Sequence, residues 1–277
     1  MSIIDRTIWL IETRAGQPLG LDELAAHAGV SRSHLSRIFP VATGHSLFGY
    51  LRARRPSVAA KALASGAADI LSVALDAGYS SHEAFTRAFR DQFGLTPEQL
   101  RRRGTISDIA IIEAMPMSDQ TTNTLAPPVI EPRPALRFAG LADRIDMSNP
   151  GGFAAIWQKF GQHLGHIPGA AGPAAFGIVG GADDTGCDYM AGVELSPGAD
   201  VPAGFREMRA PARRWARFRH DGHVSTIRST IRPIYDHWLP NSGETQAEEV
   251  SFIEYYGPDF NPMTGLGTCE IWIGLAD

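Results

Sequence analysis

The first hundred residues contain the same local pattern twice, and this repeat constrains the fold more than any other feature of the sequence. The segments Leu21–Gly29 and Ile70–Gly78 each describe a short amphipathic helix that ends at a glycine and is followed by a serine within two residues. Glycine adopts the left-handed conformation that ends a helix, and serine caps the start of the next one. The pattern therefore predicts two helix-turn-helix units.

The second helix of each predicted unit has one apolar side. Leu35 and Phe39 in the first copy, like Phe85 and Phe89 in the second, are four residues apart, so each pair packs inward on one helix face. The candidate DNA-reading residues are those left facing outward: Arg32, Ser33, Ser36 and Arg37 on the first helix, and His82, Glu83, Thr86 and Arg87 on the second.

These residues resemble the DNA-binding domain of AraC/XylS-type regulators. The likeness spans residues 3–103 and is carried mainly by the stretch from Ile70 to Pro97, with its Phe-Thr-Arg-Ala-Phe and Phe-Gly-Leu-Thr-Pro runs. It implies two helix-turn-helix units joined by a long helix at about residues 46–65, with both recognition helices on one face of the DNA. Pro56 departs from the pattern, because a proline inside a helix costs roughly 3 kcal/mol or more. A kink or break there would change the angle between the two units.

Two recognition helices in one chain suit two adjacent major-groove segments of double-stranded DNA, which are about 34 Å apart. Arg37 and Arg87 are the strongest candidates for contacts to guanine or phosphate, because the guanidinium fork matches both. We expect the sequence-reading positions to include Ser33, Ser36, His82 and Glu83, and the DNA backbone to be lined by Arg52, Arg54 and Arg55. The alternative for each exposed arginine is a solvated helix face.

The charge distribution divides the chain. Residues 1–104 hold 13 of the 25 Lys and Arg and 9 of the 30 Asp and Glu, so residues 105–277 hold 12 and 21. Only the basic first part is suited to a polyanion. The stretch from Met115 to Pro134 is polar and rich in proline, which is typical of a linker. We predict a DNA-binding domain at 1–104, a linker at 105–128 and a small-molecule-binding domain at 129–277.

The second half also repeats. Pro134–Ala139 parallels Pro211–Ala216, and each is followed by a helical pattern and then by two β-type runs. The helical patterns cover residues 153–164 and 224–239, and the β-type runs cover residues 175–179, 189–195, 252–256 and 270–275. These features predict an α+β domain of two strand-helix-strand-strand units related by a pseudo-two-fold axis, with a pocket between them. We therefore predict a multi-domain protein with an all-α double helix-turn-helix domain at the N-terminal side of the α+β domain.

This half resembles the GyrI-like effector-binding domain, through Tyr189–Leu195, Phe218–Gly222, Ile234–Gly243, Ile253–Tyr256 and Glu270–Ile273. Glu254 interrupts an apolar strand, where an unpaired carboxylate is costly. The resemblance implies an acidic residue here, in an aromatic-lined pocket for apolar cations. The candidate effector-binding residues are Glu254, Trp157, Tyr189, Trp238, Tyr256, Trp272 and His220. The alternatives are an outward or arginine-paired Glu254, core packing for the aromatic residues and a structural hydrogen bond for His220.

The leading interpretation is a transcription regulator that a small apolar or cationic effector modulates, with RNA polymerase as a further partner. A hydrolase in which Glu254 activates water, and a scavenger of reactive molecules, are the alternatives, but no nucleophile–base motif appears and we expect no enzyme activity. Cys187 and Cys269 have no metal-ligand spacing and are expected to be free thiols. We expect no cofactor, no metal, no secretion signal and no membrane span, and hence a cytoplasmic, nucleoid-associated protein.

Overall fold

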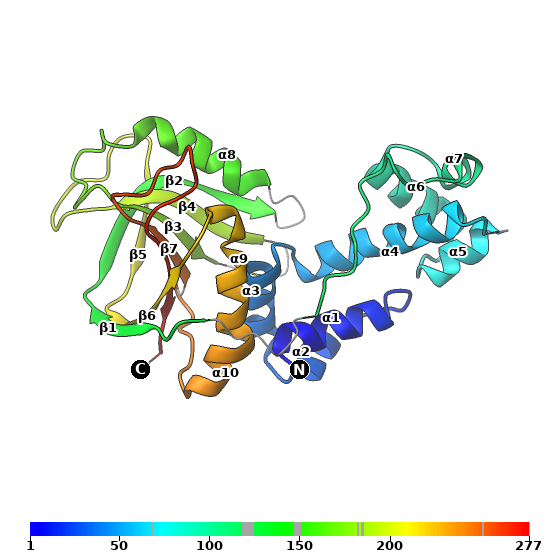
Figure 1. Cartoon of the computed structure of the whole chain (residues 1–277), viewed down its shortest axis with the longest axis horizontal. Coiled ribbons are helices and arrows are strands. Elements are labelled where there is room, and N and C mark those ends of the chain that lie inside the picture. The colour runs from blue at the N-terminus through cyan, green and yellow to red at the C-terminus, as the bar shows by residue number, and fades with distance from the viewer. Residues whose placement is uncertain are drawn as a thin grey trace. The chain divides into compact units, whose positions relative to one another are not determined.

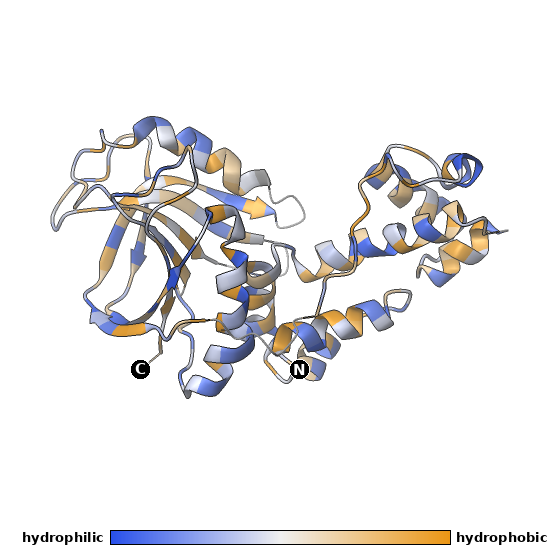
Figure 2. Ribbon diagram, in the orientation of Figure 1, coloured by the Kyte–Doolittle hydropathy of each residue, from blue (hydrophilic) through white to orange (hydrophobic). Residues whose placement is uncertain are grey.

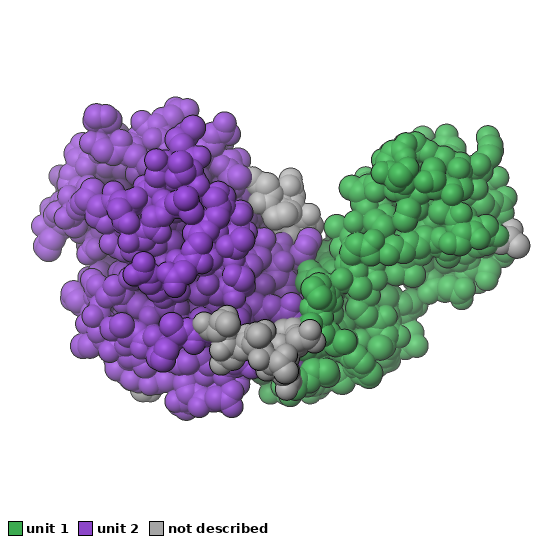
Figure 3. Space-filling view, viewed as in Figure 1, with its two compact units in different colours: residues 1, 3–35, 47–119 green, residues 2, 36–46, 120–277 purple. Residues whose placement is uncertain are grey.

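The computed structural model describes residues 1–67, 69–117, 125–146, 151–181, 183, 186–250 and 252–276. The chain divides into two compact units (Figure 3). The first comprises residues 1, 3–35 and 47–119, and the second comprises residues 2, 36–46 and 120–277. Part of the predicted linker, residues 118–124, lies outside the described residues.

The first unit is helical (Figure 1). Its helices are α1 (Ile3–Thr13), α2 (Leu21–Ala28), the first turn of α3 (Arg32–Thr43), α4 (Leu47–Ala64), α5 (Ile70–Asp76), α6 (His82–Phe93) and α7 (Pro97–Arg103). The predicted glycine stop is present, because Gly29 ends α2 with φ 74°. The second copy differs in its cap. Ser81, rather than Ser80, starts α6, and its Oγ accepts from the Ala84 amide at 3.1 Å.

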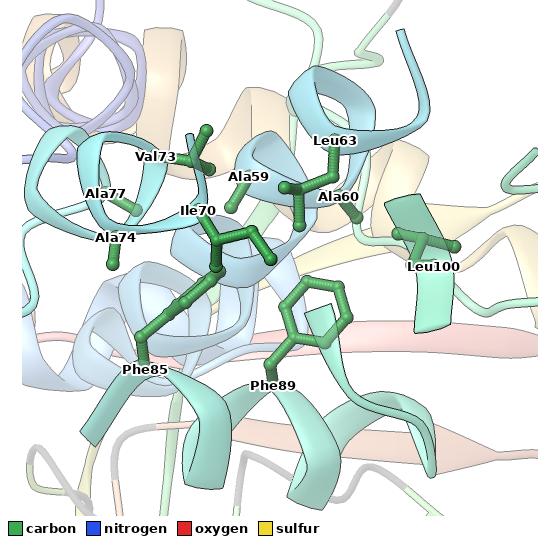
Figure 4. Packing of buried hydrophobic residues seen from close by; sticks show 10 residues of the cluster. All are labelled: Ala59, Ala60, Leu63, Ile70, Val73, Ala74, Ala77, Phe85, Phe89 and Leu100. Carbon is green, nitrogen blue, oxygen red and sulfur yellow. The ribbon is translucent and has the colours of Figure 1, made fainter. Parts of the chain in front are cut away.

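The α4–α7 half of this unit has its own apolar core. Phe85 and Phe89 on α6 are fully buried, as the sequence predicts, and Figure 4 shows them pointing toward Ile70 on α5 and the residues of α4. Ala74 is also fully buried, so the absence of a longer side chain lets α5 approach its neighbours closely. Burying one side of α6 in this way leaves its opposite side for solvent.

The helix α4 is continuous through Pro56, so Pro56 does not break it. Pro56 leaves the carbonyl of Arg52 without its usual helical donor, but the helix gains other bonds at the next turn. The Ser57 hydroxyl donates to the Ala53 carbonyl at 2.7 Å and accepts from the Ile112 amide at 3.0 Å and from Gln92 Nε2 at 3.1 Å. Packing against α5, α6 and α7 also holds α4 in place.

The described part of the second unit forms an eight-stranded antiparallel sheet in the order β1-β6-β8-β7-β3-β4-β2-β5. The strands are β1 (Val129–Arg133), β2 (Leu136–Asp146), β3 (Ala175–Gly180), β4 (Gly186–Glu194), β5 (Arg206–Ala210), β6 (Arg213–His220), β7 (Phe252–Tyr256) and β8 (Cys269–Gly274). The sequence analysis did not predict β1 and β5, which are the two edge strands of the sheet. Hydrophobic and hydrophilic residues alternate along several strands (Figure 2).

Helices cover one face of this sheet. The helix α8 (Gly151–Phe160) lies against β2 and β4 (Figure 1). The predicted helix at 224–239 is present as a series of helical segments, and Pro233 lies at the end of one of them. This series comprises η2 (Val224–Thr226), α9 (Arg228–Pro233), the π-helical η3 (Ile234–Trp238) and α10 (Leu239–Ser242). The opposite face carries its own apolar cluster, which includes Phe176, Trp215, Ile253 and Trp272.

Candidate functional site

A buried network of one carboxylate, two phenols and one indole lies on the helix-covered face of the sheet. Tyr189 on β4 donates its hydroxyl to Glu254 Oε2 on β7 at 2.7 Å, and Tyr256 donates to the same oxygen at 3.1 Å. Trp157 on α8 donates its indole N–H to the Tyr189 hydroxyl at 2.7 Å. Glu254, Tyr189, Tyr256 and Trp157, four of the seven predicted effector residues, are therefore hydrogen-bonded into one cluster.

The strand geometry explains why these side chains meet. Side chains alternate between the two faces of a strand, so Glu254 and Tyr256 share one face of β7. In the register, Glu254 lies opposite Gly177 on β3, and Gly177 lies opposite Ala191 on β4. Tyr189, two residues before Ala191, lies on the same face and reaches across the glycine to Glu254.

Gly177 is the site residue that the sequence analysis missed. A Cβ atom at this position would lie 2.3 Å from the Tyr189 hydroxyl oxygen and 2.4 Å from Glu254 Oε2. Only a glycine leaves room for the hydrogen bond between the two side chains. No periodic pattern or motif marks this glycine, because its role depends on a neighbour in the register and not on the chain beside it.

The electrostatics of the cluster favour a neutral tyrosine pair and a carboxyl that is reluctant to ionise. Burial raises the pKa of Glu254, although the hydroxyls of Tyr189 and Tyr256 stabilise the carboxylate and act in the opposite direction. Burial and the nearby Glu254 carboxylate together hold the pKa of Tyr189 and of Tyr256 well above the ordinary phenol value. When the carboxyl ionises, it is a buried negative charge that a cation would compensate.

An apolar pocket of about 930 Å³ adjoins the cluster. Its walls include the side chains of Trp157 and Tyr256, whose rings meet edge to face at 5.0 Å between centroids. Most of the remaining lining comes from α8, from the loop after it and from the loop that follows β7, and includes Leu164, Ile167, Phe260 and Met263. The volume lies in the range of pockets that hold drug-sized ligands. Loop residues such as Met263, which is 92% exposed, could not be assigned to a pocket from the sequence.

The other three predicted effector residues do not join this cluster. Trp272 pairs with Ile253 in the register, whereas Glu254 pairs with Ile271, so Trp272 lies on the opposite face of the sheet. For Trp272 the prediction of a place beside Glu254 is therefore wrong.

Trp238 and His220 have structural neighbours instead. Trp238 packs edge to face on Phe218, with 4.8 Å between ring centroids. His220 is 3% exposed, and its ring nitrogens lie 2.8 Å from the Thr230 hydroxyl and 3.2 Å from the His223 carbonyl oxygen. The structural hydrogen bond considered as the alternative for His220 is thus the one observed.

The second recognition helix presents its predicted face to solvent. His82, Glu83 and Arg87 on α6 are exposed, and Thr86 is half-buried. The N-terminal end of α6 carries a partial positive charge from its free amides. Hydrogen bonds from the Glu83 amide and the Ser81 hydroxyl lower the pKa of the Glu83 carboxyl.

The first recognition helix differs from the prediction at two positions. Arg32 and Ser33 are exposed, but Ser36 is only 6% exposed and does not face outward. Arg37 is half-buried, and its Nη1 donates to the main-chain oxygens of Glu248 at 3.1 Å and Ala247 at 3.4 Å.

Two of the arginines expected along the DNA backbone form hydrogen bonds within the first unit. Arg54 is buried and forms two hydrogen bonds with the Glu12 carboxylate, at 2.5 and 2.8 Å, and one with the Ile112 carbonyl at 2.7 Å. Arg55 donates to the carbonyls of Ala15 and Gln17. Both guanidinium groups tie α4 to α1 and the turn that follows it, so the prediction is wrong for the buried Arg54, whereas for the half-buried Arg55 it stays a prediction. Arg52 is exposed.

Comparison with known proteins matches each half of the chain to a family. Residues 126–276 match the family described as a GyrI-like small molecule binding domain, and residues 24–103 match a helix-turn-helix domain. The regulatory protein SoxS of Escherichia coli K12 is 39% identical over 101 residues, which cover 36% of this chain and 94% of SoxS. The transcriptional regulator Rob of Salmonella typhimurium LT2 is 47% identical over 109 residues, which cover 39% of this chain and 37% of Rob.

The likeness to Rob thus spans little more than a third of that protein. Among solved structures, SAV2435 bound to tetraphenylphosphonium matches 54% of this chain and 93% of its own, with a TM-score of 0.45 and 16% identity. The class of protein is therefore a helix-turn-helix domain of the AraC type joined to a ligand-binding α+β domain. The chain belongs to the GyrI-like small molecule binding domain family. No helix in the described ranges is long and apolar enough to cross a membrane.

Proposed function

We propose that the chain is a sequence-specific DNA-binding transcription regulator whose activity is modulated by a small apolar cation bound beside Glu254. The observation that carries the effector half is the buried Glu254 carboxyl, which accepts hydrogen bonds from Tyr189 and Tyr256, because Tyr256 also lines an apolar pocket of about 930 Å³. An aromatic wall attracts a cation, and the carboxylate compensates its charge in a poorly solvated place. The exposed face of α6 supports the DNA-binding half.

The effector proposal is tested by calorimetric titration of the full chain with tetraphenylphosphonium and with triphenylphosphine oxide, a neutral phenyl-rich compound. The cation should bind more tightly than the neutral compound. In Glu254→Gln the affinity for the cation should fall roughly tenfold or more, because a charged partner is lost. Glu249→Gln removes an exposed carboxylate of the same unit and serves as the matched control. Equal affinity of the cation for Glu254→Gln and the unmodified chain would contradict the proposal.

The DNA-binding half is tested on an operator selected in vitro from random duplexes. Arg87→Ala should weaken binding by about 1–3 kcal/mol in a gel-shift titration at fixed salt, because one guanidinium contact is lost. Arg102→Ala removes an exposed arginine from α7 and is the charge-matched control. Unchanged operator affinity in Arg87→Ala would remove α6 from the recognition surface.

The finer parts of the proposal concern symmetry and partners. The strand order supports two strand-helix-strand-strand units related by a pseudo-two-fold axis, because exchanging the halves β1–β4 and β5–β8 leaves that order unchanged. We infer that the two recognition helices read two adjacent major-groove segments and that RNA polymerase is a further partner. A footprint of about one and a half to two helical turns on the selected operator would support the two-segment mode. We also infer a cytoplasmic, nucleoid-associated location.

A hydrolase or scavenger is the second candidate, and the same cluster favours it. The carboxylate of a group with a raised pKa, here beside two phenols, can act as a general base for water. Incubation of the full chain with a small epoxide distinguishes an enzyme, a scavenger and a regulator. Turnover that Glu254→Gln abolishes would indicate an enzyme, one covalent adduct per chain would indicate a scavenger, and neither is expected of the regulator.

A further inference from the structure

A second, smaller pocket lies on the opposite face of the sheet from Glu254. Its volume is about 280 Å³, near the lower end of the range for small-molecule sites. Trp272, Tyr255 and Phe176, all from strands, contribute to its lining. The register places Tyr255 and Trp272 on the face that Glu254 does not occupy. The other lining residues are Arg133, Ala171, Gly172, Pro173, Ala174, Glu194, Arg217 and Pro258.

One side of this pocket is an aromatic wall. The rings of Tyr255 and Trp272 are stacked, with centroids 5.3 Å apart and planes inclined by 17°. Phe176 meets both rings edge to face, at 5.4 Å from Tyr255 and 6.0 Å from Trp272. Rigid aromatic side chains on neighbouring strands form a surface on which a planar ring packs at little entropic cost.

The two arginines of this pocket differ in how many of their guanidinium N–H groups have a partner. Arg217 forms a bidentate pair with Glu270, at 2.9 and 3.0 Å, and also donates to Glu131 at 2.6 Å. Arg133 donates through Nε to Glu131 Oε1 at 2.9 Å, and its Nη2 forms an ion pair with the same oxygen, also at 2.9 Å. Its Nη1 has no hydrogen-bond partner among the residues that the structure describes. Arg133 also lies over Trp272, with Cζ 4.9 Å from the ring centroid.

Glu194 supplies the opposite charge. Its carboxylate is half-buried and, within the described part of the chain, has no hydrogen bond or ion pair. Burial raises the pKa of Glu194, while the charge of Arg133 acts in the opposite direction. The two arginines are balanced by Glu131 and Glu270, so Glu194 is the uncompensated charge of this pocket.

We propose that this pocket is a second small-molecule site, which takes a compact aromatic zwitterion. The ring packs on the wall of Phe176, Tyr255 and Trp272, the cationic group pairs with Glu194, and the anionic group accepts from Arg133 Nη1. A purely cationic ligand would leave Arg133 Nη1 without an acceptor, and a purely anionic ligand would meet the uncompensated Glu194. A molecule that carries both charges satisfies both polar groups and avoids that repulsion.

The test compares three probes that share a phenyl ring and differ in charge: L-phenylalanine, phenethylamine and 3-phenylpropionate. Titration into the full chain is followed by the indole N–H signals in two-dimensional NMR, assigned with Trp157→Phe and Trp272→Phe. L-Phenylalanine should bind saturably, shift the Trp272 signal and leave the Trp157 signal in place. Its affinity should exceed that of each singly charged probe by roughly tenfold.

Two substitutions complete the test. Glu194→Gln should weaken L-phenylalanine roughly tenfold, whereas Glu254→Gln, in the other pocket, should leave its affinity unchanged. If Glu194→Gln does not fold, Arg133→Gln replaces it, and it should also weaken L-phenylalanine because the anionic group of the ligand loses its donor. Equal affinities for the three probes, a shift of the Trp157 signal instead, or no saturation at millimolar concentration would overturn the proposal. Because tetraphenylphosphonium is expected at the Glu254 pocket, loss of one site does not imply loss of the other.

Discussion

At the scale of single residues, the site depends on a glycine as much as on the acid. Glu254 attracts notice in the sequence because a carboxylate interrupts an apolar strand, but its hydrogen bond to Tyr189 exists only because Gly177 leaves the space between them open. The aromatic residues show the same dependence on position. Tyr189 and Tyr256 reach the acid, whereas Trp272, equally aromatic and one position after Ile271, the register partner of Glu254, lies on the other face.

Gly177→Ala should destabilise the second unit. The new Cβ would overlap the Tyr189 hydroxyl and Glu254 Oε2, so both side chains must move and a buried hydrogen bond is lost. We expect the free energy of unfolding to fall by about 1–3 kcal/mol, measured by urea denaturation. Gly161→Ala is the control, since a Cβ there meets no atom within 4 Å and should change stability by less than about 1 kcal/mol. Similar losses in the two variants would contradict the role given to Gly177.

Cation binding beside Glu254 should depend on pH. Burial raises the pKa of this carboxyl above its ordinary 4.5, and only the ionised form attracts a cation. The affinity for tetraphenylphosphonium should therefore rise as the pH rises through the raised pKa and should level off above it. Calorimetry from about pH 5 to about pH 8 measures this rise, and Glu254→Gln should show a flat profile. A profile that rises equally in Glu254→Gln would assign the dependence to another group.

The same shift has a defined sign for stability. A buried carboxyl with a raised pKa binds its proton more tightly in the folded chain than in the unfolded one. Its protonated form therefore stabilises the fold at low pH, and this stabilisation is lost as the pH rises from about 4.5 through the raised pKa. Above the raised pKa the ionised Glu254 costs stability, which a bound cation recovers.

At the scale of elements, the second helix-turn-helix follows its local signals closely. The glycine stop, the serine cap and the two inward phenylalanines of α6 are all present. The cap lies one residue later than the repeat suggested, because Ser81 and not Ser80 has the extended backbone and the reach to the Ala84 amide. The sequence thus locates the start of this helix to within one or two residues, and the backbone geometry of the cap decides the exact position.

Ser81→Ala should destabilise the first unit by about 1 kcal/mol, because the amide at the start of α6 loses its acceptor. Ser80→Ala is the matched control, since Ser80 is exposed and its neighbour provides the cap. Thermal unfolding followed by circular dichroism measures both. If Ser80→Ala proved the more destabilising of the two, the assignment of the cap to Ser81 would be wrong.

The long helix α4 shows where local rules mislead. A proline in its interior favours a break, but the helix continues because Ser57 and the packed neighbours supply contacts that a sequence window does not contain. Arg54 and Arg55 show a related effect. Two arginines next to a predicted DNA-binding surface suggest phosphate contacts, yet Glu12 and the turn after α1 engage them.

At the scale of the whole molecule, the proposed regulator must couple its two sites. If an effector changes operator affinity by some factor, operator DNA must change effector affinity by the same factor. We expect gel-shift titrations with and without tetraphenylphosphonium to give a factor that differs from one, and calorimetric titrations with and without operator duplex to reproduce it. A scrambled duplex is the control. Two factors of one would show that the sites are independent, which would contradict effector control of DNA binding.

The sequence by itself determined the features that depend on neighbouring residues or on internal repetition. Two helix-turn-helix units, the apolar side of α6 and the exposed side with His82, Glu83 and Arg87 follow from the spacing of apolar residues along a helix. The α+β second half and the importance of Glu254 follow from alternation along strands and from a carboxylate where apolar residues are expected.

Only the tertiary structure decided which distant residues meet. The register of the sheet selected Tyr189 and Tyr256, and not Trp272, as partners of Glu254, and it made Gly177 necessary. The edge strands β1 and β5, and the loops that line the larger pocket, were likewise fixed by long-range pairing and packing. The physical reason is that the periodicity of apolar residues indicates which face of a helix or strand is buried. It does not indicate which other helix or strand packs against that face, and a binding site depends on that pairing.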